Sequence, residues 1–361
     1  MESSPVSPPS RPGAATAPTL EDVAAAAGVS RATASRAING RSSVKPAAAA
    51  AVARAVEDLG YRPNSAARLL AGGRTGSVAL ILTEPDLSSM GSSSSESFFA
   101  LPLRGVMTGI ARASKQLVML LASASDDDED RLQRYLEAGH VDGAMVVLEA
   151  HSSYLPSQLR EAPLPVVYLG RPPDDPELFS YVDVDNYAGG RIAAQELVDA
   201  GRTRIAHIAG PTDLGVAIDR TAGWRDVLRE HGLSDDAIAR ADFSVEGGEA
   251  AMTTLLARVP DLDAVFVSSD LMAVGALRAI RASGRQVPRD VSVVGYDDLV
   301  VAGTLEPPLT SVRQPLEAMG SMMVDSLLTL LASPDSRPVS RVITPELTRR
   351  ASVTPPAPSA S

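Results

Sequence analysis

The sequence contains no cysteine among its 361 residues, and only 4% of them are aromatic. The lack of cysteine excludes disulfides and thiolate metal sites, and it fits a reducing cytoplasm. Long apolar runs are also missing, because stretches such as 78–82 have the length of a strand, far short of the ~20 residues of a membrane helix. The first residues, MESSP, form no basic and apolar leader, so we expect neither secretion nor membrane insertion. A hydrophobic content of 45% predicts a folded protein with a substantial core.

The net charge of −11 is unevenly distributed. Residues 1–76 carry nine basic and five acidic side chains, a net +4, whereas the other 285 residues carry 24 basic and 39 acidic ones, a net −15. A basic head on an acidic body indicates that only the head meets a polyanion. The alternative is that this charge difference is a chance fluctuation in a short segment, and a DNA-binding motif within residues 1–76 is needed to exclude it.

Composition and pattern divide the chain into five segments. The Ser-, Pro- and Ala-rich tails, 1–18 and 353–361, are predicted to be disordered because they cannot bury enough apolar surface. Residues 19–62 are predicted to form a helix-turn-helix head, and 63–76 a hinge helix and linker. Residues 77–352 form the body.

Helix start and stop signals predict three short helices in the head. The first is capped by Thr19, with Asp22 in the reciprocal capping position, and it ends at Gly28. The second begins after Ser30, and the third begins at Pro46, where a missing N–H costs nothing. Short helices joined by a glycine-containing turn are typical of a helix-turn-helix, which presents the start of its second helix to base edges in the major groove.

The start of that second helix carries side chains suited to DNA. Arg31 and Arg36 can enter one groove, and the planar fork of arginine matches guanine O6 and N7 with ~1–3 kcal/mol of discrimination per good pair. Ala32 offers only a methyl group. The short hydroxyls suited to phosphates are Ser30, Thr33 and Ser35. The alternative is a solvated basic face on a small helical domain.

In the body, strand-sized runs alternate with amphipathic helical stretches. This alternation predicts a parallel α/β fold with ligands at the carboxyl ends of the strands. The expected strands are Val78–Leu82, Leu117–Leu121, Ala144–Leu148, Val166–Leu169, Ile205–Ile208, Ala264–Val267 and Ser292–Gly295.

Two head motifs resemble the lac/galactose repressor family. Residues 19–40, TLEDVAAAAGVSRATASRAING, resemble the family's head, and residues 61–70, YRPNSAARLL, resemble its hinge helix. The resemblance extends over about residues 19–352. It implies that Arg31, Ala32 and Arg36 read bases and that Leu70 enters the minor groove at the operator centre. The further DNA contacts that it implies are Asn39, Asn64 and Arg68.

Physical chemistry makes the implied hinge role reasonable. A hinge helix over 64–70 is too short to persist alone, so it should order only beside its dimer mate on DNA. An inserted apolar side chain unstacks a base step and bends the duplex; the alternative is that Leu70 packs in a linker. Two departures from the family stand in the head. Ala34 occupies a usual valine position, and Lys45 occupies a usual Ser/Thr capping position, which removes ~1 kcal/mol of capping.

The body resembles the family's regulatory domain, which is similar to periplasmic sugar-binding proteins. Stretches 183–186, 204–211, 269–277, 294–298 and 307–315 carry this resemblance. The implied fold is an all-α helix-turn-helix head plus an α/β, two-lobed, periplasmic-binding-protein-like effector domain with parallel sheets. The chain would cross between the lobes near Ala200, Thr310 and Pro338.

The resemblance and the strand ends together select effector-binding candidates. Asp297 follows a predicted strand directly, and Asp270 does the same, although Asp270 could equally cap the next helix. For the aromatic candidates Phe98, Phe99 and Phe243, the alternative to contact with an effector is packing in the core. The full candidate set is Phe98, Phe99, Arg220, Phe243, Asp270 and Asp297.

The pocket departs from the family pattern in three places. Ile218 stands where many members carry an arginine that binds ligand oxygens, and Ser269 replaces a common asparagine. The Ser-rich insertion 89–97 is expected to be either a lid over the cleft or a flexible loop without a role in binding. These departures disfavour an ordinary hexose and leave open an effector with fewer hydroxyls, or none.

The sequence disfavours two other classes of protein, an enzyme and a free-standing binding protein. An enzyme is disfavoured because no nucleophile elbow, phosphate loop or zinc signature occurs. The four histidines are scattered, with His207 expected in the core. The acidic run 126–130 could chelate a cation, but a solvated helix start, favoured by the helix dipole, is the expected role. A free-standing sugar-binding protein is disfavoured by the helix-turn-helix and the missing leader.

We therefore expect a cytoplasmic transcriptional repressor that binds a palindromic operator as a homodimer. A small-molecule effector, a sugar or another metabolite, would shift the dimer between DNA-competent and DNA-incompetent states, acting as an inducer. The Pro-, Ala- and Ser-rich C-terminal tail lacks a tetramer-forming heptad helix, so a dimer is predicted. No cofactor, metal or catalytic residue is expected.

Overall fold

The computed structural model describes residues 18–38, 44–61, 74–83, 96–122, 126–147, 159–172, 174–333 and 336–353. The chain divides into two compact units, Met1–Thr75 and Gly76–Ser361, which are called the head and the body below. Several predicted positions lie outside the described residues: Asn39, Asn64, Arg68, Leu70 and the insertion up to residue 95. The side chains of Phe98 and Phe99 lie outside them as well.

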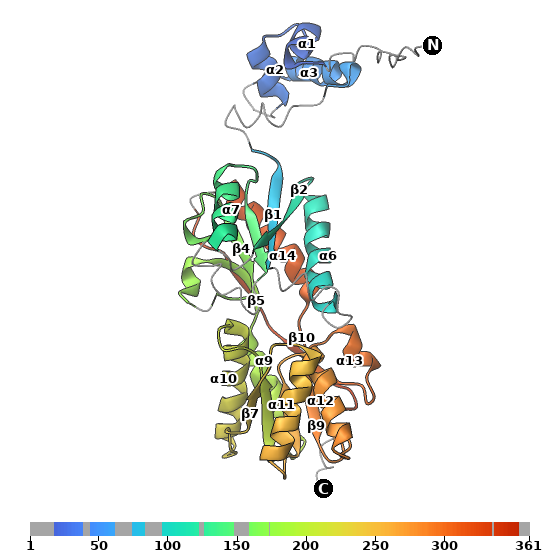
Figure 1. The fold of residues 1–361 in the computed structure, drawn as a ribbon. Coiled ribbons are helices and arrows are strands. Elements are labelled where there is room, and N and C mark those ends of the chain that lie inside the picture. Colours follow the sequence, from blue (N-terminus) through green and yellow to red (C-terminus); the bar gives the residue numbers. More distant parts are fainter. Residues whose placement is uncertain are drawn as a thin grey trace, which may run out of the picture. The chain divides into compact units, whose positions relative to one another are not determined.

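The head consists of three short helices, as predicted (Figure 1). These are α1 (Leu20–Ala26), α2 (Arg31–Ile38) and α3 (Pro46–Leu59). The capping box is confirmed, because the Asp22 amide donates to the Thr19 hydroxyl at 3.3 Å and the Thr19 amide donates to the Asp22 carboxylate at 2.8 Å. Gly28 has φ +64°, the left-handed conformation predicted for the turn after α1. Lys45 provides no side-chain cap for α3, also as predicted.

Two six-stranded sheets form the body, and each belongs to one lobe. The first sheet has the order β11-β5-β4-β3-β1-β2 and is entirely parallel. Its strands are β1 (Ser77–Thr83), β2 (Gln116–Ala122), β3 (Ala144–Val147), β4 (Val166–Leu169), β5 (Ser180–Val184) and β11 (Ser340–Ile343). The second sheet has the order β12-β10-β9-β8-β6-β7, with only the edge strand β12 antiparallel. Its strands are β6 (Ile205–Ala209), β7 (Ile238–Arg240), β8 (Ala264–Val267), β9 (Ser292–Asp297), β10 (Thr310–Arg313) and β12 (Glu346–Thr348).

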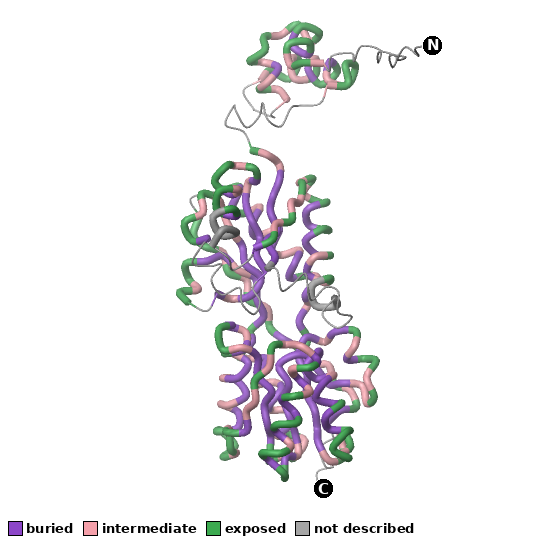
Figure 2. Tube along the Cα trace, viewed as in Figure 1, coloured by how far each residue is buried: buried purple, intermediate pink, exposed green. Residues whose placement is uncertain are grey.

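Helices cover both faces of each sheet (Figure 1). Residues Val78, Leu80 and Leu82 of β1 pack in one cluster with α6 and α14, whereas Ala79 and Ile81 pack in another cluster with α7. Burial on both faces explains the continuous aliphatic run of this strand, and Figure 2 shows the strands as the most buried part of the body. The helices of the body are α6 (Glu96–Arg112), α7 (Asp126–Glu137), α9 (Asn186–Asp199), α10 (Gly215–Glu230), α11 (Val245–Arg258), α12 (Asp270–Ala282), α13 (Val300–Thr304) and α14 (Leu316–Ala332).

All seven expected strands are present, so the two-lobed parallel α/β architecture is confirmed. The sequence does not predict β5, β7, β10, β11 or β12. Strands β7 and β12 have only three residues each, and β5, SYVDV, alternates polar and apolar residues as a loop can. The acidic run does begin a helix, α7, at Asp126. Within the described part of the chain, no helix is long and apolar enough to cross a membrane.

The missed strands displace the predicted crossovers between the lobes. The chain crosses at 185, 314–315 and 344–345, directly after a strand in each case. The predicted points near Ala200, Thr310 and Pro338 are therefore wrong: the first lies at the end of α9, the second inside β10, and the third before β11.

Glycines bring helices α9 and α10 into direct backbone contact, and this contact positions the site. A Cβ atom on Gly190 would lie 2.2 Å from the Arg220 carbonyl oxygen, and one on Gly223 would lie 2.1 Å from the Tyr187 carbonyl oxygen. Real Cβ atoms essentially never approach backbone so closely, so only glycine permits this crossing. As a result, Arg220 on α10 lies next to Asn186 at the start of α9.

Candidate functional site

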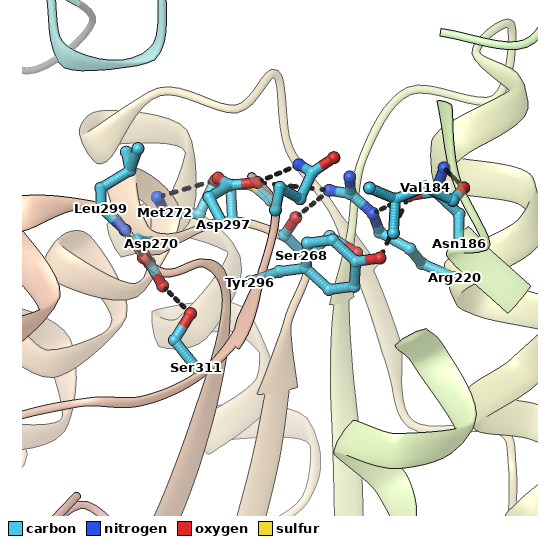
Figure 3. Close-up of polar contacts among 12 residues, drawn as sticks. Val184, Asn186, Arg220, Ser268, Asp270, Met272, Tyr296, Asp297, Leu299 and Ser311 are labelled. Atoms are coloured by element: carbon cyan, nitrogen blue, oxygen red, sulfur yellow. Dashed lines mark hydrogen bonds and ion pairs between the residues drawn. The ribbon is translucent and has the colours of Figure 1, made fainter. Parts of the chain in front are cut away.

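Arg220 is the centre of a buried polar network at the carboxyl ends of the strands (Figure 3). Its Nε donates to Oδ1 of Asn186 at 2.9 Å, and its Nη1 donates to the carbonyl of Ser268 at 2.6 Å. The guanidinium carbon lies 3.6 Å from the centroid of the Tyr296 ring, a cation–π arrangement. Arg220 thus joins the first crossover to the ends of β8 and β9.

Asp297, the last residue of β9, is the acidic partner in this network. Its Oδ1 accepts from Nε2 of Gln314 at 2.6 Å and lies 3.9 Å from Nη1 of Arg220. Burial raises the pKa of Asp297 to about 6, although the Arg220 charge opposes this shift. The backbone at Asp297 has φ +107°, and Asp298 follows with φ +56°. Such left-handed non-glycine residues carry strain and cluster at functional sites.

Asp270 is not the helix cap. Ser269 caps α12 by accepting from the Met272 amide at 3.2 Å, and Asp270 is the first residue of the helix. The Asp270 carboxylate accepts from the Leu299 amide and from the Ser311 hydroxyl, each at 2.7 Å. Burial, together with the charge of Asp297, raises the pKa of Asp270 well above its ordinary value. The capping interpretation is therefore wrong, because both carboxylate oxygens connect α12 to β10 and to the loop after β9.

Asp183, at the end of β5, is the corresponding buried carboxylate of the first lobe. Its Oδ1 accepts from the Val184 amide and from Nδ2 of Asn186, and its Oδ2 accepts from the Arg171 amide at 2.8 Å. Burial raises the pKa of Asp183 to about 6, opposed by these hydrogen bonds. No role was expected from the sequence for Asp183, Asn186 or Gln314. All three lie at or just after the ends of β5 and β10, two strands that the sequence pattern did not predict.

An ion pair connects the two lobes beside this network. Arg171 follows β4 of the first lobe, and Asp219 lies on α10 of the second. The Asp219 carboxylate lies 2.6 Å from Nη2 and 3.2 Å from Nε of Arg171. Both side chains are about a quarter exposed. Apolar residues add to the contact between the lobes, because Val245, Leu271 and Leu299 of the second lobe belong to the core cluster of the first.

This ion pair is expected to contribute measurably to the stability of the body. In a double-mutant cycle with Arg171→Gln and Asp219→Asn, we expect a coupling of about 1 kcal/mol in urea unfolding, since a partly buried, doubly bonded pair exceeds a typical surface pair. The more exposed pair Arg112–Asp325 is the control, with an expected coupling below about 0.5 kcal/mol. Equal couplings in the two cycles would show that the lobes gain nothing special from this contact.

The remaining effector candidates differ in their surroundings. Phe243 has φ +67°, an outlier for an aromatic residue, and a Cβ atom on Gly210 would lie 2.3 Å from its Cζ. Ile218, expected to stand at a common arginine position of the family, is 46% exposed. Arg220, two residues later, is buried and bonded to protein groups. The structure therefore brings Arg220, Asp270 and Asp297 into one buried network.

The predicted reading face of α2 is exposed in the head. Arg31, Ala32 and Arg36 are exposed, whereas Ala34 is fully buried against the other helices. The Ser30 hydroxyl accepts from the Thr33 amide at 3.2 Å, which caps α2. Ser35 is partly buried. A short helix with an exposed basic start, presented by a glycine turn, has the form of a recognition helix.

A helix-turn-helix head and a two-lobed body with a polar network between its lobes together indicate a DNA-binding regulator, and comparisons with known proteins agree. Residues 19–64 match the family model "Bacterial regulatory proteins, lacI family", and residues 194–353 match a "Periplasmic binding protein-like domain". The transcriptional regulator CelR of Thermobifida fusca is 46% identical over 339 residues, which cover 93% of this chain and 98% of CelR. The ribose operon repressor of Escherichia coli K12 is 33% identical, over 92% of this chain and 99% of the repressor.

Solved structures give the same result. A CelR–cellobiose complex matches with a TM-score of 0.72 and 44% identity, covering 93% of this chain and 99% of that one. A lac repressor dimer bound to operator and the anti-inducer ONPF matches with a TM-score of 0.72 and 27% identity, covering 92% and 98%. The chain belongs to the lacI family of bacterial transcriptional regulators.

Proposed function

We propose that this protein is a cytoplasmic homodimeric repressor, without catalytic activity, that binds a palindromic operator and is released from it by a small saccharide. The observation that carries this proposal is the 46% identity to CelR, which continues through head and body over 98% of that regulator. The basic start of α2 supplies the DNA contacts. The network between the lobes supplies the structural link to an effector.

Cellobiose is the first effector to test, because the CelR structure at 44% identity is a complex with this disaccharide. Phe98, Phe99 and Phe243 are proposed to stack on sugar rings, and Asp297 to accept from sugar hydroxyls. Arg220 and Asp270 are proposed to position the groups that contact the sugar and not to contact it themselves, because Nε and Nη1 of Arg220 and both carboxylate oxygens of Asp270 are bonded to the protein. An exposed isoleucine at position 218 disfavours an acidic sugar, since no guanidinium is offered there.

Effector binding and DNA binding are coupled through the arrangement of the two lobes in this proposal. A ligand that binds one arrangement of the lobes better than the other shifts the dimer toward that arrangement. The crossovers are tied together, since the Asp185 amide donates to the Ile343 carbonyl at 2.8 Å and Arg220 bonds to Asn186 directly after the first crossover. A change in the network would therefore act on several crossovers at once.

The test is selection of bound DNA from random duplexes by the full-length protein at fixed salt. We expect one palindrome, released by cellobiose and not by ribose. In the selected operator, Arg31→Ala should lower specific affinity by about tenfold and relax the preference at one symmetric base pair. Arg54→Ala, on the exposed side of α3, is the charge-matched control and should leave the base preference unchanged. Recovery of no palindrome, with or without cellobiose, would refute the repressor proposal.

A further inference from the structure

The Nε atoms of both candidate reading arginines are bonded within the head. Nε of Arg31 lies 2.6 Å from Oε1 of Glu21, and Nε of Arg36 donates to the Ala32 carbonyl at 3.1 Å. Glu21 lies in the first turn of α1, so the first bond crosses from one helix of the motif to the other. Both members of the ion pair are more than 60% exposed.

This arrangement leaves the end of each guanidinium available to DNA. A guanidinium has five N–H donors in a rigid plane, and recognition of guanine uses two of them against O6 and N7. When Nε is held by a protein acceptor, the two terminal nitrogens form the remaining edge, and the plane of the group has a defined orientation. A free arginine must lose rotamer freedom on binding, whereas a held one has already lost part of it.

Helix capping alone does not explain Glu21. The capping box is already complete with Thr19 and Asp22. A carboxylate next to a DNA-reading helix also repels phosphates and lowers affinity for any sequence. An exposed ion pair contributes little to folding stability. If Glu21 orients Arg31 for base recognition, the gain in selectivity can offset the DNA affinity that its negative charge removes.

We propose that Glu21 is a positioning residue that sets the base preference of Arg31 on the operator. The proposal depends on Arg31 reading a base, as proposed above, and adds that the selectivity of this contact comes partly from α1. Glu21 itself touches no base in this scheme. Arg36, held by a backbone carbonyl of its own helix, needs no such partner.

The experiment measures binding to the selected operator and to the operator variant changed at the symmetric base pair that Arg31→Ala identifies. Glu21→Ala should reduce the affinity ratio of these two duplexes by about fivefold. Glu21→Gln, whose amide oxygen can still accept from Nε, should retain most of the ratio. Glu57→Ala, an exposed acidic position on α3, is the charge-matched control and should raise affinity for both duplexes equally.

Three outcomes would overturn the proposal, and they are distinguishable from one another. If Glu21→Ala behaves like Glu57→Ala, with an unchanged ratio, Glu21 contributes only charge. If Arg31→Ala leaves the base preference unchanged in the selection, the reading role of Arg31 fails first, whatever Glu21 does. In the background of Arg31→Ala, the expected result is that Glu21→Ala no longer changes any base preference. A change that persists in that background would assign Glu21 a contact of its own with DNA.

Discussion

Replacing Arg220 by methionine is expected to lower the free energy of unfolding of the body by about 3–5 kcal/mol. The substitution leaves the buried Asp297 carboxylate without its cation and removes the Arg220 donor from the Ser268 carbonyl. Oδ1 of Asn186 loses one of its two donors and keeps the Tyr296 hydroxyl. Methionine retains much of the volume, so the loss is chiefly electrostatic. Urea unfolding can be followed through the fluorescence of Trp224, the single tryptophan, which is fully buried one turn further along α10.

The matched control for Arg220 is Arg349→Met. Arg349 is 70% exposed and ion-paired with Glu196, so its replacement should cost less than about 1 kcal/mol. Adding Asp297→Asn to Arg220→Met should recover part of the stability, because the unpaired charge is removed along with its partner. If Arg220→Met cost no more than the control, the buried network would not be a determinant of the fold of the body.

Acidification to pH 4 is expected to remove about 3 kcal/mol of stability through His207 alone. This ring is fully buried, between Phe266 and Trp224 at centroid distances of 4.7 and 5.2 Å. The Phe266 carbonyl, 3.1 Å from Nδ1, can only accept, so the neutral ring donates there. Nε2 lies 3.1 Å from the Thr221 hydroxyl, which donates to the Ala217 carbonyl at 2.8 Å. Burial lowers the pKa of His207 to about 3. The core position predicted for this histidine is confirmed.

The direction of this pH effect follows from linkage. Because the folded-state pKa of His207 lies below its unfolded value of about 6.5, its contribution is complete above pH 6.5 and is lost as the pH falls toward 3. Asp183 and Asp297 act in the opposite direction, since their pKa values are raised to about 6 in the folded protein. Their contribution is complete below pH 4 and is lost as the pH rises through 6.

Comparison of the wild type with His207→Gln isolates the histidine, because both carboxylates are retained. The difference in unfolding free energy between the two proteins should change by about 3 kcal/mol between pH 7 and pH 4. A parallel pH dependence for the wild type and His207→Gln would contradict the assignment.

Local signals in the sequence were sufficient for the head and for the central strands. The capping pair Thr19 and Asp22 are three residues apart, and the glycine at position 28 reports a backbone conformation at that residue alone. Strands buried on both faces, such as β1 and β8, are recognisable because their central residues form an uninterrupted apolar run. The apolar run before Asp297 also predicted that this residue lies at the end of a strand, and it is the last residue of β9.

The weak edge strands and the crossovers required more than local pattern. Strand β5 alternates polar and apolar residues, and its polar Asp183 is buried only because Arg171 and Asn186 donate to it. Asp270 does not cap α12 because its carboxylate accepts from donors distant in sequence, at Leu299 and Ser311, which leaves the Ser269 hydroxyl as the cap. The burial of Asp183 and the role of Asp270 both depend on partners that are distant in the sequence.

Local signals were enough to identify the class of fold, the helix-turn-helix and the family, because these depend on a few neighbouring residues or on a motif whose residues follow one another in the chain. Which polar groups meet depends instead on how distant segments pack. The contact between Arg220 and Asn186 spans 34 residues, and that between Arg171 and Asp219 spans 48. The free energy of a buried charge depends on the partners that surround it in space. Those partners become neighbours only when α9 and α10 cross at their glycines and the two sheets are connected.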